Sequence, residues 1–534
     1  MSEAQKTDYT SLVPQFLFPD TLPEQEARLE TNSLMQRLLA YRKRYEGDPH
    51  RPIYHYVNPE NTLNDPNGLC FWQDRWHLFY QAYPPEDPRQ HWGHAVSDDL
   101  IHWRDLPYAI YPNPEECCYS GTTLVEEDRV IAIYHGTKVG NMVAVSHDPL
   151  LLNWEKLTGA PVIPIASEDG SPLPYRVFDP CIWKKGDHYY ALSGGTLPHA
   201  ASGKRTRANF LFRSPNLVDW DYLHPFVEGD IFTLVGDDGA CPYFWPIGDR
   251  HILLFFSHMS GGQALLGDYD TERDKFVVTS QHDFNFGAFG PGGVHAPSAT
   301  PDGKGGVYVI FNMNPAKPTA GWNQIMTLPR RLTLQGTDKI GRDTLLVEPA
   351  GDVESLRSEH RQITDMVLPA NQEIVLGSIR GNAIELMAEI ETNDAPMVEL
   401  NVLRSPGKEE FTRIAFYRER GFRDWERYQG WQRDKLAAAT DSLISIDSSY
   451  SSLSPDVRSR APETGPVFLE RDEPLRLRVF VDRSVVEVFV NGKQCVAMRV
   501  YPDREDSVGV SLRSQGQEAR VVSLEAWQME NIYA

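Results

Sequence analysis

Five similar apolar runs recur along the first 335 residues at nearly constant spacing, and this repeat restricts the fold more than any other feature. Counted from Trp76, Val130, His188, His251 and Val307, the spacings are 54, 58, 63 and 56 residues. Each run is short enough for a strand, and most follow a turn signal rich in Gly, Asp or Glu. Periods of this length with several short strands each are typical of a β-propeller, here with five blades.

A second marker follows the first three runs and repeats with them. It reads S-D-D-L-I-H-W at 97–103, S-H-D-P-L-L-L-N-W at 146–154 and S-P-N-L-V-D-W at 214–220. Because the marker recurs from copy to copy, we expect Asp98, Asp99 and Trp103 to have a structural role.

The propeller arrangement makes neighbours of residues that are far apart in the sequence. The innermost strands of all blades line one central axis, and counting back 9–12 residues from each run leads to Asp65, Ser120, Asp179, Ala240 and His295. We therefore expect Asp65, in N-D-P-N-G, and Asp179, in F-D-P, to face one opening. Two carboxylates there repel each other, which costs free energy unless the site uses them. N-D-P-N-G alone also fits an ordinary turn.

Alternating apolar and polar runs in the C-terminal third indicate a second domain. Examples are I-E-L-M-A-E-I (384–390), A-R-V-V-S-L-E-A-W (519–527) and a run ending in the turn N-G at 491–492. The sequence thus predicts an all-β protein: an N-terminal extension (1–50), a five-bladed β-propeller (51–340), a linker (341–370) and a C-terminal antiparallel β-sandwich (371–534). One amphipathic helix is expected in the extension, over Glu24–Tyr45.

Composition narrows the class of function. The formal net charge of −22 argues against a nucleic-acid partner, because such binding depends on clustered Lys and Arg. The six cysteines lack C-x-x-C spacing and are interpreted as free thiols, and without an H-x-x-x-H pair no metal site or cofactor is indicated. The N-terminus has no secretory signature and no window holds 18 consecutive apolar residues. We expect a cytoplasmic protein without a membrane partner.

Eight motifs in a fixed order carry a resemblance to a known family. They are N-D-P-N-G (64–68), F-Y-Q (79–81), W-G-H-A-V-S-D-D-L-I-H-W (92–103), Y-S-G-T (119–122), F-D-P (178–180), C-P-Y-F (241–244), G-W-N-Q-I-M-T-L-P-R-R-L-T-L (321–334) and V-D-R-S-V-V-E-V-F-V-N-G (481–492). From about residue 50 onward the chain resembles the fructofuranosidases of glycoside hydrolase family 32, which include invertases, inulinases, levanases and fructosyltransferases. Two carboxylates without metal ligands also suit glycoside hydrolysis.

The resemblance implies roles for individual residues. Asp65 would be the nucleophile that forms a covalent fructosyl intermediate, and Asp179 the transition-state stabiliser. Further positions match the family's fructose pocket: Asn64, Gln81, Trp92 and Ser120. For Trp92, ordinary packing within a blade is an equally good interpretation.

Two positions depart from the family pattern. The family's general acid is the Glu of E-C-P, whereas this chain has Ala240 in G-A-C-P. Alanine cannot deliver a proton, which forfeits about 10²–10⁴ in rate. The stabiliser motif R-D-P is F-D-P here, and Arg176, two positions upstream of Phe178, is the candidate replacement on the same strand face.

Three explanations for Ala240 stay open at this point. An engineered Glu→Ala exchange would leave the other motifs intact, and an inactive relative would bind sugar without cleaving it. A natural subgroup would use another carboxylate. Asp238 is the first candidate because it lies two residues before Ala240 on an extended strand, and the others are Asp237, Glu115 and Glu116.

The sequence therefore predicts a retaining enzyme that hydrolyses or transfers β-D-fructofuranosyl units of sucrose, levan or inulin oligosaccharides. The alternative is a catalytically impaired relative that binds a fructoside or another furanoside. Whether the protein is a monomer or a homo-oligomer is left open by the sequence.

Overall fold

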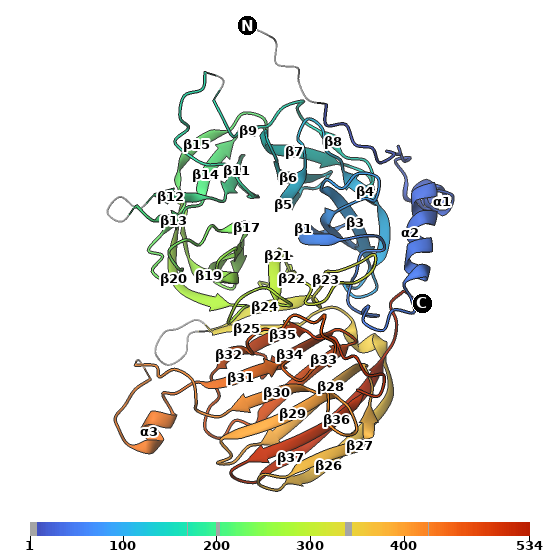
Figure 1. The fold of residues 1–534 in the computed structure, drawn as a ribbon. Helices are drawn as coiled ribbons and strands as arrows, with labels where there is room; N and C mark the ends of the chain where they lie inside the picture. Colours follow the sequence, from blue (N-terminus) through green and yellow to red (C-terminus); the bar gives the residue numbers. More distant parts are fainter. Residues whose placement is uncertain (1–7, 168, 199–202, 337–343, 426, 534) are drawn as a thin grey trace.

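The computed structural model describes residues 8–167, 169–198, 203–336, 344–425 and 427–533. Within these ranges five twisted antiparallel sheets surround a common axis, and two larger sheets pack below them (Figure 1). The predicted all-β class, with a propeller followed by a sandwich, is confirmed.

Each blade is a sheet of four main strands, with one short extra strand in blades two, four and five. Blade one holds β1 (Leu63–Trp72), β2 (Arg75–Ala82), β3 (His91–Ser97) and β4 (Arg104–Ile110). Blade two holds β5 (Cys118–Val125), β6 (Val130–Gly136), β7 (Gly140–Ser146), β8 (Glu155–Lys156) and β9 (Ile163–Pro164). Blade three holds β10 (Pro180–Lys185), β11 (His188–Ser193), β14 (Phe210–Ser214) and β15 (Asp221–Pro225), beside the separate pair β12 (Thr196–Pro198) and β13 (Arg205–Arg207). Blade four holds β17 (Ala240–Ile247), β18 (Arg250–Ser257), β19 (Gly261–Asp270), β20 (Lys275–Asp283) and β16 (Val227–Glu228). Blade five holds β21 (Val294–Pro301), β22 (Val307–Met313), β23 (Ile325–Met326), β24 (Arg330–Gln335) and β25 (Thr344–Pro349).

The inner strands form a closed ring, in which β1 contacts β5 and β21, while β10 and β17 complete the circuit. One buried hydroxyl holds four of these strands together. Tyr243 Oη, on β17, donates to the Gly121 carbonyl on β5 at 3.0 Å and accepts the Gly68 N–H of β1 at 3.2 Å. It also lies 2.9 Å from the Ser298 hydroxyl on β21. Closure therefore depends on polar contacts at the axis as well as on apolar packing between blades.

The outer marker motif has the expected structural role. Asp99 Oδ1 accepts the backbone N–H groups of Ile101 and His102 at 2.9 and 2.8 Å, and so shapes the turn before β4. Trp103 is buried, whereas the Asp98 side chain is 85% exposed.

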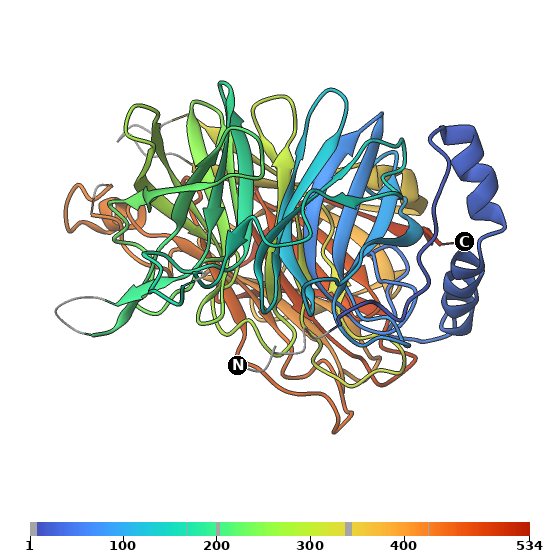
Figure 2. The same cartoon turned by 90° about the horizontal axis from the view of Figure 1, so that it is seen from above.

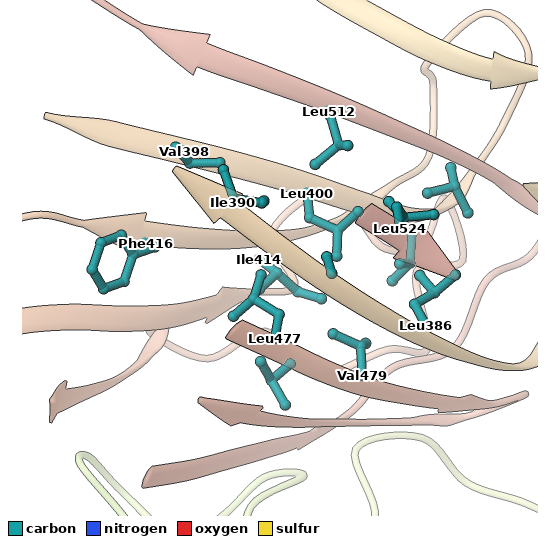
Figure 3. Close-up of a cluster of buried hydrophobic side chains, with 14 of the residues drawn as sticks. Leu386, Ile390, Val398, Leu400, Ile414, Phe416, Leu477, Val479, Leu512 and Leu524 are labelled. Carbon is teal, nitrogen blue, oxygen red and sulfur yellow. The ribbon is translucent and has the colours of Figure 1, made fainter. Parts of the chain in front are cut away.

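The C-terminal domain consists of two six-stranded sheets packed face to face. The first holds β26 (Arg357–Leu368), β37 (Ala519–Met529), β28 (Ala383–Glu391), β33 (Leu475–Asp482), β34 (Val485–Val490) and β35 (Gln494–Arg499). The second holds β27 (Glu373–Arg380), β36 (Gly509–Gln515), β29 (Met397–Arg404), β30 (Thr412–Tyr417), β31 (Ser442–Asp447) and β32 (Glu463–Val467). Their facing aliphatic side chains, such as Leu386, Leu400 and Val479, form the core (Figure 3). A 3₁₀ turn, η1 (Val353–Leu356), precedes this domain, and a short helix, α3 (Arg433–Ala437), lies in one of its loops.

The predicted linker is wrong for most of its length. Of the range 341–370, residues 341–343 lie outside the described residues, Thr344–Pro349 is the outer strand of blade five and Arg357–Leu368 pairs with β37. Only residues 350–356, which include η1, connect the two sheets, because both flanking strands have ladder partners.

A buried charge cluster joins the two domains. Asp482 accepts the backbone N–H groups of Ile53, Tyr54 and His55, each at 2.9 Å, and its Oδ2 lies 2.9 Å from His55 Nδ1. Glu487 contacts His55 Nε2 at 3.1 Å and Arg330 at 2.7 Å. Burial alone would lower the pKa of His55, but the two carboxylates outweigh it and raise that pKa. The sandwich motif at 481–492 thus fixes the sandwich to the propeller.

The N-terminal extension contains two helices where one was predicted. These are α1 (Leu22–Glu30) and α2 (Ser33–Arg44), and the break occurs because Asn32 caps α2 by accepting the N–H groups of Leu34 and Met35. Both lie on the outside of blade one (Figure 2). Among the described residues no helix is both long and apolar enough to cross a membrane. All six cysteines are free.

We predict that Tyr243→Phe destabilises the protein more than its small change in volume suggests. The variant leaves the Gly121 carbonyl and the Gly68 N–H without their buried partner, and such groups cost roughly 1–3 kcal/mol each. Urea unfolding should therefore show a loss of about 2–4 kcal/mol. Tyr450→Phe is the matched control, because Tyr450 is 61% exposed. Equal losses in the two variants would contradict the role assigned to Tyr243.

Candidate active site

The inner strands carry local irregularities where the predicted site residues lie. Register shifts separate Leu63 from Pro66 on β1, Cys118 from Gly121 on β5, Ala240 from Tyr243 on β17, and Val294 from Pro297 on β21. These four gaps contain Asp65, Ser120, Cys241 and His295. Bulges of this kind re-aim side chains away from the regular alternation, and here they turn polar groups of four blades toward the axis. The fifth group, Asp179, directly precedes β10.

Asp65 is fixed firmly through one oxygen and has fewer contacts at the other. Its Oδ2 accepts from Ser120 Oγ at 2.7 Å and Gln81 Nε2 at 3.2 Å, with Cys241 Sγ at 3.5 Å. Its Oδ1 accepts no well-aligned hydrogen bond from the described residues. The carboxylate is thus oriented through Oδ2, while Oδ1 is buried with His295 as its neighbour.

The charge state of Asp65 is set by its neighbours. His295 Nδ1 lies 3.1 Å from Asp65 Oδ1. Burial alone would raise the pKa of Asp65, but His295, Ser120 and Cys241 outweigh it and the pKa is lowered. Asp65 is therefore an anion at neutral pH, as a nucleophilic carboxylate must be.

Asp179 lies beside Asp65 under opposite electrostatic conditions. Its Oδ2 accepts the Cys241 N–H at 3.0 Å, and Cys241 Sγ lies 3.5 Å from Oδ2 of both aspartates. Cys241 has a left-handed backbone, with φ of 49°, which is uncommon outside glycine. Burial, together with the charge of Asp65, raises the pKa of Asp179 to about 7. Two adjacent carboxyls with separated pKa values are typical of sites that do acid–base or covalent chemistry.

An amide network extends the site toward blade five. Asn64 Nδ2 donates to Gln81 Oε1 at 3.1 Å, and Asn64 Oδ1 accepts from Asn312 and Gln324 at 3.2 and 3.1 Å. Gln81 also donates to Ser120 at 2.9 Å. Asn64, Gln81 and Ser120, predicted from the sequence, are thus brought together around Asp65.

Two other predicted contact residues are placed differently. Trp92 is completely buried against Phe79 and Tyr134, and its Nε1 donates to the Tyr119 carbonyl at 2.9 Å. Its assignment to the sugar pocket is wrong in this structure, and blade packing is the correct interpretation. Arg176 is exposed in an irregular segment before β10. The prediction that strand alternation brings it to Asp179 therefore fails, since no strand exists there.

Ala240 lies in an apolar cluster at the site. It packs with Cys241, Phe256 and Ala296, and Phe178 and Phe289 cover this cluster. The two departures from the family motifs, at 178 and 240, therefore contact the same group of side chains.

The four candidate replacement acids have distinct surroundings. Asp237 is buried and accepts from Ser257, Ser260 and the Leu234 N–H, so it builds a turn. Glu115 is buried against Lys156 and Tyr134, and Glu116 lies near Lys138. Asp238 is half-buried and pairs with His258, where Asp238 Oδ2 and His258 Nδ1 are 2.6 Å apart.

Sequence reasoning gave no role to several side chains that the structure brings to the site. His295 had been placed at the start of an inner strand, and that position was the available signal. Cys241 and Gln324 lie in the motifs at 241–244 and 321–334, but those motifs did not assign them a contact, and Asn312 and His258 lie in no motif.

We predict that Asp179→Asn stabilises the protein at high pH and not at low pH. The pKa of Asp179 is about 7 in the folded state against an ordinary value of 3.8, so the folded state binds the extra proton between these values. Wild-type stability therefore falls as pH rises from about 4 to about 7. Asparagine does not titrate, and its Oδ1 can still accept the Cys241 N–H.

The measurement is the unfolding temperature of both proteins at pH 5 and pH 8. From these temperatures, the difference in unfolding free energy between the variant and the wild-type protein should grow by up to a few kcal/mol between pH 5 and pH 8. The reason is that one pKa unit corresponds to about 1.4 kcal/mol. Asp98→Asn, at an exposed carboxylate, is the control. A difference that does not change with pH would contradict the assignment.

Comparison with known proteins gives consistent matches along the chain. Residues 55–349 match the model of the glycosyl hydrolases family 32 N-terminal domain, and residues 352–528 match that of the family 32 C-terminal domain. The chain is 26% identical to a levanase of Bacillus subtilis, covering 92% of this chain and 72% of the relative. It is also 26% identical to a sucrose-6-phosphate hydrolase of Escherichia coli, covering 88% and 93%. Fructan 1-exohydrolase IIa from Cichorium intybus has a similar fold, with a TM-score of 0.75 and 21% identity over 91% of this chain and 98% of that one.

Proposed function

The chain belongs to glycosyl hydrolase family 32, and from that premise we propose that it cleaves β-D-fructofuranosides with retention of configuration. The observation that carries this proposal is the state of Asp65. This carboxylate is anionic, fixed through Oδ2 and without a well-aligned hydrogen bond at Oδ1, beside a second buried carboxyl. Such a group can attack the anomeric carbon of a bound fructose and form a covalent ester.

Asp179 is proposed as the transition-state stabiliser. As the furanose ring gains positive character, an adjacent carboxyl oxygen holds its hydroxyl groups more tightly. The Cys241 N–H fixes Asp179 Oδ2 and so orients the carboxyl toward the side on which Asp65 lies. Asn64 and Gln81 supply amide groups for the sugar, each worth about 1–3 kcal/mol where the contact strengthens in the transition state.

The substrate proposal follows the relatives. Proteins named levanase and sucrose-6-phosphate hydrolase act on β-fructofuranosyl groups, so sucrose, levan and inulin oligosaccharides are the compounds to test. Water or a second sugar can capture the intermediate, which gives hydrolysis or transfer. A cytoplasmic location stays a prediction, and the choice between monomer and homo-oligomer stays open.

A second candidate is a protein that binds fructosides without turning them over. Ala240 favours it, because the position of the family's acid is occupied by a methyl group within an apolar cluster. The two candidates differ in product formation, not in binding.

We predict that Asp65→Asn abolishes turnover and preserves binding. Asparagine keeps the shape and the Ser120 contact but is not a nucleophile, so kcat should fall at least about 10³-fold. Calorimetry with sucrose should give a Kd close to that of the wild-type protein. Asp98→Asn serves as the control because that carboxylate is exposed and remote in the marker turn.

Retention is checked with methanol as the acceptor, which should yield methyl β-D-fructofuranoside. Full activity of the Asp65→Asn variant would refute the assigned nucleophile. Thermal stabilisation of the wild-type protein by sucrose, levan or inulin without any product would support the binding candidate instead.

A further inference from the structure

Asp238 and His258 form an ion pair at the rim of the site. Asp238 Oδ1 accepts the backbone N–H of His258 at 3.2 Å, and its Oδ2 lies 2.6 Å from His258 Nδ1. The aspartate thus fixes both the backbone and the ring of the histidine. The His258 side chain is 59% exposed, and its Nε2 has no hydrogen-bond partner among the described residues. An imidazole with one nitrogen anchored and the other open to solvent is suited to pass a proton.

The pair adjoins the position where the family's acid would lie. Asp238 precedes Ala240 by two residues, and Ala240 pairs across the sheet with Phe256, two residues before His258. Both members therefore extend from the same end of β17 and β18. This is the end at which Cys241 donates to Asp179.

Two further contacts connect the pair to the catalytic carboxyls. Consecutive amides bind the backbones of the two aspartates: Gly194 N–H donates to the Asp179 carbonyl at 2.9 Å, and Gly195 N–H donates to the Asp238 carbonyl at 3.2 Å. The Phe256 ring lies between two histidines, with its centroid 4.0 Å from that of His295 and 5.1 Å from that of His258. His295 in turn contacts Asp65.

We propose that His258 is the general acid of this enzyme and that Asp238 is its positioning residue, in place of the glutamate that is absent at Ala240. The proposal rests on the function proposed above. The proton donor then lies on the loop that follows β18, and not on the inner strand β17.

The reaction consists of two displacements at the anomeric carbon. Asp65 Oδ1 forms a bond to the anomeric carbon while the bond from that carbon to the leaving oxygen breaks, and the proton on His258 Nε2 passes to this oxygen. In the second step neutral Nε2 takes a proton from water, whose oxygen bonds to the anomeric carbon and displaces the ester of Asp65. Fructose leaves and the imidazolium is restored, so each group ends as it began.

The surroundings favour the protonated ring. The hydrogen bond to Asp238, opposed by partial burial, raises the pKa of His258, and the charges of Asp179 and Asp65 add to this. The titratable groups of the described residues that act on His258 are Asp238 before β17, Asp179 before β10 and Asp65 on β1. His295 on β21 lies across the Phe256 ring, and Asp237 is bound to Ser257 and Ser260. The donor is therefore charged at low pH and loses its proton as pH rises.

The test compares two leaving groups in a His258→Ala variant. Glucose leaves sucrose poorly without a proton, whereas nitrophenolate leaves 4-nitrophenyl β-D-fructofuranoside without one. We expect kcat/KM to fall about 10²–10⁴-fold for sucrose and less than about tenfold for the aryl substrate. The ratio kcat/KM is used because it covers binding and the first chemical step and excludes the later hydrolysis of the intermediate. Asp238→Asn should change the two substrates in the same unequal manner, by a smaller factor.

The matched control is His102→Ala. His102 is 47% exposed and its Nδ1 lies 2.7 Å from Asp99 Oδ2, so this pair has the same chemistry away from the axis. Equal rates of the His258→Ala and His102→Ala variants on sucrose would overturn the proposal. Equal losses of the His258→Ala variant on both substrates would also overturn it, because they indicate a role in binding or folding.

The pH profile of the wild-type protein separates His258 from Asp179, which also titrates, near 7. A decline at high pH caused by His258 appears for sucrose and not for the aryl substrate, whereas a decline caused by Asp179 appears for both. If the wild-type protein cleaves neither compound, the proposed function fails and the role of His258 falls with it. If the wild-type protein cleaves both and His258→Ala changes nothing, the role of His258 alone is refuted.

Discussion

The hydroxyl of Tyr243 is the contact on which the geometry of the site depends. It joins β1, β5, β17 and β21 at the propeller axis, a few residues beyond the irregular segments that carry Asp65, Ser120, Cys241 and His295. None of these four blades can rotate or slide without breaking a buried hydrogen bond there. The site residues that they carry come from separate sheets, so their relative positions are only as constant as this junction.

The buried charges of the protein fall into two kinds. At the domain junction, Asp482 and Glu487 are matched by His55, Arg330 and backbone N–H groups, so that little unbalanced charge is left. At the axis, Oδ1 of Asp65 is buried without a well-aligned hydrogen bond, and Asp179 is buried next to it without a cationic partner of comparable strength. Unmatched buried charge lowers stability, and the molecule tolerates it only where the closed ring holds the carboxyls together. Buried charge without a matching partner therefore distinguishes the active site from the domain junction.

Much of this arrangement was predictable from the sequence, for a specific reason. The repeat near 57 residues fixes which segments become inner strands, and propeller closure then places Asp65, Ser120, Asp179, Ala240 and His295 around one axis. The predictions that failed concern residues whose positions depend on the local backbone and on single hydrogen bonds. Strand alternation misplaced Arg176 because residues before β10 are irregular, and family matching misplaced Trp92 because its indole is bound by the Tyr119 carbonyl. The contacts of His258, Asn312 and Gln324 could not be predicted, because they cross between segments whose relative rotation is set by bulges.

The two departures from the family motifs are best understood as one change. Phe178 replaces a positively charged residue and Ala240 a negatively charged one, and both side chains now belong to one apolar cluster with Phe256 and Phe289. Removing a single buried charge costs about 3–5 kcal/mol, whereas exchanging an opposite pair for well-packed apolar groups is often neutral. A single Glu→Ala exchange does not account for Phe178, so a natural subgroup explains both positions more simply. Once that wall is apolar, a proton donor cannot remain on it. The proton must come from a group that keeps contact with water, and His258 at the rim, oriented by Asp238, meets that condition.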